Sequence, residues 1–290
     1  MKSTKQARFS IILSMVIWGT LAPFVRNIPV SSGELALYRA ILATMMLSFY
    51  LLRTKQSICL RSLGKELYYL LFSGIAMGFN WILLFEAYKY TTVAISTLSY
   101  YFAPVIVTIA SPFLFKEKIT VRQVLCFAMA TLGLTLVIGI TNLGRSGNDA
   151  IGIAFGLGAA ALYATVILLN KHIKGVSGIH RTFLQFLAAI LVLIPYVGFT
   201  GGVNLSQLNT VGWICLLVVG FVHTGITYCL YFSSVKEIPG QEAAILSYVD
   251  PLVAVVIGIV LLNEPLSWQQ LVGGSMILGF TLWNELDTGK

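Results

Sequence analysis

The chain has 290 residues, of which 57% are hydrophobic and only 10% are charged. A soluble protein of this length needs more polar surface than this composition supplies, so we exclude a soluble globular domain and predict an integral membrane protein. The net charge of +8 comes from cations dispersed over several short links, and we therefore do not interpret it as a nucleic-acid-binding patch.

Ten apolar runs are long enough to cross a bilayer as helices, for which about 20 residues are needed. The runs do not alternate apolar and polar residues as barrel strands do, so we predict an all-α integral membrane protein with ten transmembrane helices. The first run follows MKSTKQAR with no small-residue cleavage site, and we expect a retained helix and not a signal peptide. The ten predicted spans are 9–27, 33–52, 66–86, 92–115, 121–140, 151–170, 181–199, 211–233, 240–262 and 267–285.

The basic residues predict how these helices are oriented. Fifteen Lys and Arg fall in the links and tails on the side of the N-terminus, whereas Arg26, Lys89 and Arg145 fall on the opposite side and Arg39 lies within a span. Because Lys and Arg are concentrated in cytoplasmic loops, we expect both termini to be cytoplasmic.

The chain is internally duplicated. Residues 79–135 align without a gap with residues 226–282, at a shift of 147 positions. Five helices per copy is an odd number, so the copies must enter the membrane in opposite orientations, and we predict two inverted five-helix repeats over residues 1–145 and 146–290. Many secondary transporters are built in this way, with the substrate site near mid-membrane between the repeats. The shift pairs Phe85 with Phe232, Tyr101 with Tyr248, Pro104 with Pro251, Glu117 with Glu264 and Gln123 with Gln270.

Several of these features together resemble one known family. The Trp18-Gly19 pair with Pro23, Arg39 in the second span, and the paired blocks SYYFAP…FKEK and SYVDP…LNEP are similar to the drug/metabolite transporter superfamily, specifically its EamA branch. The resemblance covers nearly the whole chain. It implies a multi-pass carrier for a small metabolite in the bacterial inner membrane, often an amino-acid or drug exporter, although some relatives import choline or sugars.

The first span carries a tryptophan and a proline that both point to a cavity. Trp18 lies near the middle of the span, where a tryptophan that anchors a helix at the membrane interface is not expected. We predict that it lines a cavity, with Tyr163 as its repeat counterpart. Pro23 removes a backbone hydrogen bond and is predicted to kink the span.

Three ionisable residues in other spans have two interpretations each. Arg39, whose repeat counterpart Gln185 is neutral, is either a structural cation or an anchor for a substrate carboxylate. Glu86 lies near the outer end of its span, where we expect it to be solvated, with a coupling role as the alternative. His223 either forms a hydrogen bond to a neighbouring helix or relays protons.

Spans 92–115 and 240–262 are predicted to be bent and to face the cavity, because each carries a tyrosine and a proline in mid-span. Asp250 precedes the second proline. An acid at this depth holds a cationic group of the substrate, binds a coupling proton or satisfies another helix. The tyrosines and prolines are Tyr101 with Pro104 and Tyr248 with Pro251.

Three pairs of aromatic residues related by the repeat are expected to surround a central cavity. Such rings attract an ammonium group by cation–π interaction, worth about 2 kcal/mol per ring when desolvated, and they also stack on aromatic solutes. The rings therefore fit a zwitterionic or cationic organic solute without choosing between the two. The pairs are Trp18 with Tyr163, Trp81 with Tyr228, and Tyr101 with Tyr248.

We predict a secondary transporter that works by alternating access, with no cofactor and no metal, and with proton coupling left open. Export of an amino acid or similar metabolite is the leading hypothesis, and import of a quaternary amine such as choline is the alternative. A membrane enzyme is not favoured, because the sequence has no HExxH motif and no second acid near Asp250. We expect a small-molecule substrate and the lipid bilayer as partners, no nucleic acid, and leave a homodimer open.

Overall fold

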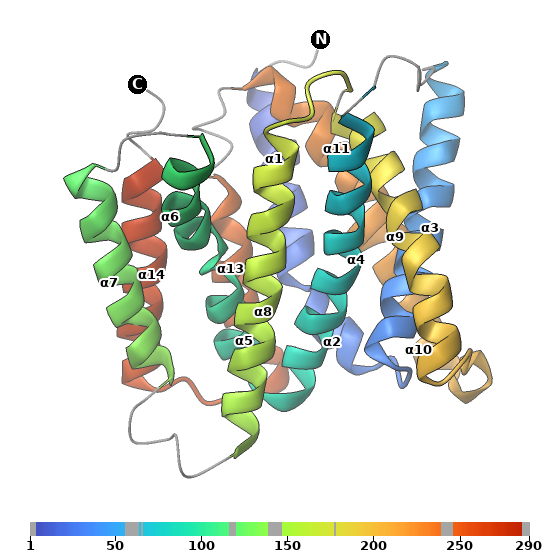
Figure 1. Ribbon diagram of the computed structural model, residues 1–290. Helices are drawn as coiled ribbons and strands as arrows, with labels where there is room; N and C mark the ends of the chain where they lie inside the picture. The colour runs from blue at the N-terminus through green and yellow to red at the C-terminus, as the bar shows by residue number, and fades with distance from the viewer. Residues whose placement is uncertain are drawn as a thin grey trace.

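The structure is a computed structural model that describes residues 4–55, 64, 66–115, 120–138, 147–176, 178–238 and 246–285. Every regular element in this part of the chain is a helix, and the helices stand side by side in one bundle (Figure 1). The all-α prediction is therefore confirmed for the described residues. The first helix begins and the last helix ends at the same end of the bundle, the upper end in Figure 1.

Helices are present at each of the ten predicted spans, and several spans consist of two or more segments. The predicted start of the span 240–262 and the predicted end of the span 121–140 lie outside the described residues. The α-helices are α1 (Thr4–Gly19), α2 (Leu21–Arg26), α3 (Ser32–Arg53), α4 (Glu66–Tyr90), α5 (Val93–Tyr100), α6 (Ala103–Phe115), α7 (Val121–Ile138), α8 (Gly147–Asn170), α9 (Gly178–Thr200), α10 (Thr210–Leu217), α11 (Thr227–Ser234), α13 (Val249–Leu262) and α14 (Trp268–Glu285).

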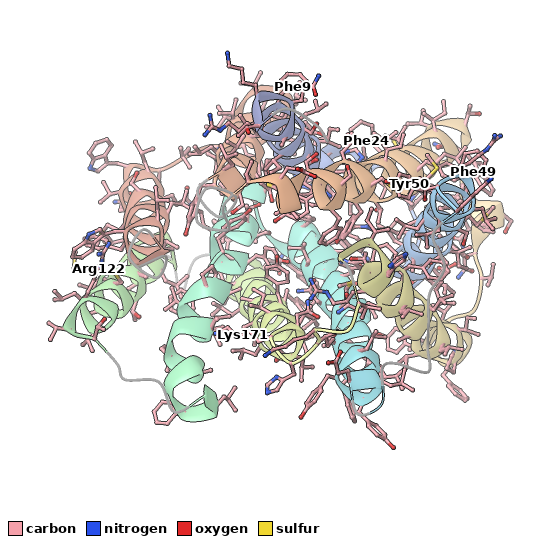
Figure 2. The ribbon with its side chains drawn as sticks, turned by 90° about the horizontal axis from the view of Figure 1, so that it is seen from above. Phe9, Phe24, Phe49, Tyr50, Arg122 and Lys171 are labelled. Atoms are coloured by element: carbon pink, nitrogen blue, oxygen red, sulfur yellow. The ribbon has the colours of Figure 1, made fainter. Side chains whose placement is uncertain are left out.

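Six stretches of the described chain are long and apolar enough to cross a membrane, judged by length and composition. Large apolar side chains such as Phe9 and Phe49 are exposed at the periphery of the bundle (Figure 2). Since the hydrocarbon core of a bilayer is itself apolar, this surface suits lipid. The six stretches are Thr4–Arg26, Ser32–Arg53, Glu66–Tyr90, Asn148–Asn170, Gly178–Thr200 and Thr210–Ser234, and shorter apolar helices are found at Val93–Val107, Val124–Leu136 and Val249–Leu262.

Three helices are interrupted three residues before a proline. A proline has no backbone N–H, and its ring clashes with the carbonyl four residues earlier, so a helix is disrupted there. These interruptions confirm the predicted kink in the first span and the predicted bends in the spans 92–115 and 240–262. They lie at Thr20 before Pro23, at Tyr101 before Pro104 and at Tyr248 before Pro251.

The segment Val218–Ile226 between α10 and α11 is a π-helix, which the sequence analysis did not predict. The hydroxyls of Thr224 and Thr227 donate hydrogen bonds to carbonyl oxygens five residues earlier, at 2.9 Å to Val219 and 2.7 Å to Val222. Single π-helical turns are frequent at functional sites. Here the wider turn packs against α3.

The core of the bundle is formed mainly by α3, α4 and α9, and its largest fully buried side chains include Phe85 and Phe186. The backbones of α4 and α9 approach each other closely at Gly74. A Cβ atom on Gly74 would lie 2.5 Å from the carbonyl oxygen of Gln185 and 2.7 Å from Ala188 Cβ. Small residues allow this kind of close packing in membranes. At one edge of the bundle, α7 packs against α14 (Figure 1).

This packing predicts that Gly74→Leu destabilises the protein. The added side chain has to separate α4 from α9, and overpacking of this kind costs about 1–3 kcal/mol. Gly198→Leu is the matched control, because nothing lies within 4 Å of a Cβ atom on Gly198 in α9. Thermal unfolding in detergent measures both variants. Equal melting temperatures for Gly74→Leu and the wild type would contradict the close approach of the two helices.

Candidate functional site

A cavity of about 380 Å³ lies inside the bundle and is lined by helices from both halves of the chain. Its volume is within the range of roughly 300–1,000 Å³ that small-molecule sites occupy. The cavity brings together most of the residues that the sequence analysis selected for the site. Those that line it are Trp18, Arg39, Trp81, Tyr101, Tyr163, Tyr228 and Asp250.

Aromatic rings in contact with one another form much of the cavity wall. The ring centroid of Trp18 lies 5.2 Å from that of Tyr228 and 5.4 Å from that of Tyr231. The ring of Tyr163 stacks on Tyr100 at 5.3 Å. Tilted and stacked contacts of this kind restrict the orientation of each ring. Tyr100 and Tyr231 were not among the predicted site residues, because neither belongs to a repeat-related aromatic pair.

His223, which was predicted for the site, does not line the cavity. It is buried in the π-helix, where its Nε2 lies 3.1 Å from the Thr20 hydroxyl and its ring lies 4.9 Å from that of Phe24. Its backbone carbonyl accepts a hydrogen bond of 2.7 Å from the indole N–H of Trp18. His223 thus contacts a neighbouring helix and orients a cavity residue through its main chain.

Tyr248 and Glu86 also lie outside the cavity wall. Tyr248 is buried in the break before α13, and its ring centroid lies 6.4 Å from that of Tyr101. Tyr101 is the member of this pair that borders the cavity.

Glu86 is partly exposed and forms an ion pair of 3.1 Å with Lys89 on the same helix. That position agrees with the interpretation of Glu86 as a solvated residue.

Asp250 is the only carboxylate among the described residues that line the cavity. It lies in the first turn of α13 and accepts a hydrogen bond of 2.8 Å from the hydroxyl of Tyr101. The same hydroxyl lies 3.4 Å from the carbonyl oxygen of Ser247. Two proline breaks, one in each half of the chain, therefore meet at this carboxylate.

Arg39 is held by hydrogen bonding and by aromatic packing. Its Nε donates a hydrogen bond of 2.6 Å to the hydroxyl of Thr224 in the π-helix. Its guanidinium lies 4.8 Å from the ring centroid of Trp81 and 5.6 Å from that of Phe85. The residue is only 4% exposed, and no carboxylate in the described part of the chain forms an ion pair with it. Cation–π contacts therefore take the place of a counter-ion.

A polar group that the sequence analysis did not assign lines the cavity near the end of α8 and the start of α9. It contains Asn170, Arg181 and Gln185. Arg181 was counted as a cation in a link, but α9 begins at Gly178 and so includes Arg181 in its first turn. Gln185 was noted only as the neutral counterpart of Arg39. The repeat alignment was the one signal available for it.

An ion pair joins the two halves of the chain at the opposite end of the bundle. Arg26 and Glu264 approach within 2.6 Å, and Arg26 also donates hydrogen bonds to the carbonyl oxygens of Tyr88 at 3.2 Å and Thr91 at 2.9 Å. The other oxygen of Glu264 accepts a hydrogen bond of 2.7 Å from the backbone N–H of Val93. This network ties α2, the end of α4 and the start of α5 to the segment after α13.

Residues 6–139 and 150–284 each match the model of the EamA-like transporter family. The chain belongs to this family. Together the two matches cover almost the whole of the EamA-like chain, so the resemblance noted in the sequence analysis is confirmed.

Individual relatives of this EamA-like chain are also transporters. It is 32% identical over 279 residues to the uncharacterized transporter YxxF of Bacillus subtilis (strain 168), covering 95% of this chain and 88% of the relative. It is 30% identical over 282 residues to an uncharacterized transporter of Archaeoglobus fulgidus, covering 95% and 96%. The threonine/homoserine exporter RhtA of Escherichia coli (strain K12) is 25% identical over 223 residues, covering 76% and 72%.

One crystal structure that is 15% identical in sequence superposes with a TM-score of 0.63, covering 99% of this chain and 98% of the other. That similarity shows a shared fold. The family match and the named relatives identify a multi-pass membrane transporter and not a membrane enzyme.

The environment of Arg39 in this EamA-like transporter predicts that Thr224→Val destabilises the protein more than Thr227→Val does. Both hydroxyls donate to the π-helix backbone, but only that of Thr224 also accepts a hydrogen bond from Arg39. A buried donor that is left unpaired costs about 1–3 kcal/mol, and more when it is charged. Thermal unfolding in detergent compares the two variants, and equal melting temperatures would show that Thr224 does not hold Arg39.

Proposed function

We propose that this EamA-like transporter exports a small zwitterionic metabolite, most simply an amino acid, across the bacterial cytoplasmic membrane. The composition of the cavity wall carries the proposal, because one carboxylate, Asp250, shares the cavity with the guanidinium groups of Arg39 and Arg181 and with aromatic rings. A solute with both an ammonium and a carboxylate group compensates charges of both signs. The name of RhtA, a threonine/homoserine exporter, supports the same class of solute.

Import of a quaternary amine such as choline is the less supported alternative. A permanent cation would share the cavity with two arginines, which repel it. In addition, the Arg39 guanidinium lies 4.8 Å from the ring centroid of Trp81 and so occupies an aromatic surface that an ammonium group would otherwise use.

The proposed architecture has ten transmembrane helices in two inverted repeats, residues 1–145 and 146–290. The family model matches once in each half, and helices are present at all ten predicted spans. The start of α1 and the end of α14 at one end of the bundle fit an even number of crossings (Figure 1). The distribution of basic residues supports placing that end in the cytoplasm.

The proposed mechanism is alternating access, in which the cavity opens to one side of the membrane at a time. In the proposed orientation the Arg26–Glu264 ion pair lies at the outer end of the bundle and closes it. Asn170 and Arg181 lie towards the cytoplasmic end. The structure then corresponds to a state closed to the outside, and release of an exported solute requires the ion pair to separate.

In this mechanism Asp250 binds either the ammonium group of the solute or a coupling proton.

The first test of this function is solute binding by the purified protein. Thermal shift across a panel of amino acids, choline and related amines measures it, because a ligand stabilises the state to which it binds. We expect selective stabilisation by one or a few amino acids, followed by saturable flux of the same unaltered compounds into proteoliposomes. Selective stabilisation by choline would instead support the amine carrier.

The role of Asp250 predicts that Asp250→Asn lowers flux in proteoliposomes by about tenfold or more. The substitution preserves the size of the side chain but removes the negative charge, and hydrogen bonds to charged groups contribute about 1.5–3 kcal/mol. Glu86→Gln is the matched control, since Glu86 lies outside the cavity wall, and its flux should equal that of the wild type. Wild-type flux in Asp250→Asn, with substrate bound normally, would contradict the role of this carboxylate.

The closure at Arg26 predicts that Glu264→Gln makes the cavity more accessible from outside. A single cysteine replaces Thr97, which lines the cavity, in a background lacking the 4 native cysteines. A membrane-impermeant maleimide applied to cells should then label this cysteine about tenfold faster in Glu264→Gln than in the parent protein. A tenfold change is expected if the substitution destabilises the closed state by about 1.4 kcal/mol.

Lys89→Gln is the control for this labelling experiment. It breaks an exposed ion pair on α4 and leaves the Arg26–Glu264 contact intact, so its labelling rate should be that of the parent. An unchanged rate in Glu264→Gln would show that this ion pair does not close the outer end.

A further inference from the structure

Arg181 is a half-buried cation in the cavity wall, and the proposed function assigns it no specific contact with the solute. It lies in the first turn of α9 and lines the same cavity as Asp250. Asn170, the last residue of α8, also lines the cavity. The end of α8 lies at the upper end of the bundle in Figure 1, whereas α2 ends with Arg26 at the lower end.

Arg181 differs from Arg39 in that its guanidinium is not engaged by the protein. Arg39 donates to Thr224 and is covered by two aromatic rings. For Arg181, none of the residues described by the structure supplies a hydrogen bond, an ion pair or a covering ring. A guanidinium in a cavity within a membrane protein is costly without a partner, so its position points to a ligand that supplies the missing anion.

Asn170 provides a second donor on the same part of the wall. Its Oδ1 accepts a hydrogen bond of 2.8 Å from Nε2 of Gln185. This nitrogen of Gln185 also donates a hydrogen bond to the Ser73 hydroxyl. This contact fixes which end of the Asn170 amide faces Gln185. The amide nitrogen Nδ2 points the other way, and it donates no hydrogen bond to any residue in the described part of the chain. Arg181 and Asn170 thus offer donors only, which suits an anion and not an ammonium group.

We propose that Arg181 and Asn170 form the subsite that binds the carboxylate group of the transported solute. The proposal rests on the proposed function and narrows its substrate class: the solute needs a free carboxylate, and the amide or ester of the same compound is not a substrate. The planar guanidinium binds a carboxylate through two parallel hydrogen bonds, which gives both affinity and orientation. Arg39 contributes positive potential, whereas Arg181 makes the contact.

A comparison of each amino acid with its own carboxamide tests this subsite. The two ligands share the side chain and the ammonium group and differ only in the carboxylate. For the amino acid that the wild type binds best, the dissociation constants of acid and amide are measured by calorimetry. The wild type should bind the acid about 10- to 100-fold more tightly than the amide, the effect expected for a charge-assisted hydrogen-bonded pair.

Two variants should reduce this preference by different means. Arg181→Gln removes the cation, and Asn170→Asp places a negative charge beside the bound carboxylate while it keeps an oxygen for Gln185. Both should bring the ratio of the two constants close to one and leave amide binding nearly unchanged. Arg53→Gln, on the exposed end of α3 beside Phe49, should keep the wild-type ratio.

The outcomes separate the subsite from the proposed function. A wild-type ratio in Arg181→Gln, or in Asn170→Asp if the first variant does not fold, would overturn the subsite and leave an amino-acid transporter in place. Equal binding of acid and amide by the wild type would likewise overturn the subsite and leave an amino-acid transporter in place. If the wild type binds no amino acid at all, the proposed function fails, and the subsite fails with it.

Discussion

A chain that crosses a membrane must satisfy its backbone hydrogen bonds without water, and this constraint decides where its helices can be interrupted. The three proline breaks lie at positions that border the cavity or pack directly behind its wall. Tyr101 occupies one break and Asp250 lies just after another, and their hydrogen bond of 2.8 Å joins the two halves of the chain. The interrupted backbone therefore lies at the cavity wall or directly behind it, where a break is tolerated because it lines a cavity or is buried in protein.

The buried charge of Arg39 imposes a second constraint on the packing. An unpaired guanidinium within the bundle is costly, and the fold compensates it with a hydroxyl from the π-helix and with the faces of Trp81 and Phe85. The second half of the chain has the neutral Gln185 at the equivalent position. The family model matches each half of the chain, whereas the cavity residues of the two halves differ in charge, which suits the two different ends of the proposed zwitterionic solute.

The two ends of the cavity also differ in how their arginine side chains are paired. At one end, Arg26 is satisfied by Glu264 and by two carbonyl oxygens, which ties the two halves together. At the other end, Arg181 lines the cavity without an ion partner among the described residues. In the proposed alternating-access mechanism, the cation at one end is neutralised by the protein and closes that end, and in the proposed subsite the cation at the other end is neutralised by the solute.

The sequence by itself determined the class, the helical segments, the proline breaks and the family of this protein, because these depend on local composition and on spacing along the chain. It also identified Trp18, Trp81, Tyr101, Tyr163, Tyr228 and Asp250 as neighbours of one cavity. Only the tertiary structure decided that His223 and Tyr248 lie outside the cavity wall and that Arg181 lies within it. The rotation of each helix about its axis selects the side chains that face inward. That rotation depends on contacts between distant segments and on the π-helical turn, and the pattern along a single helix defines it only in part.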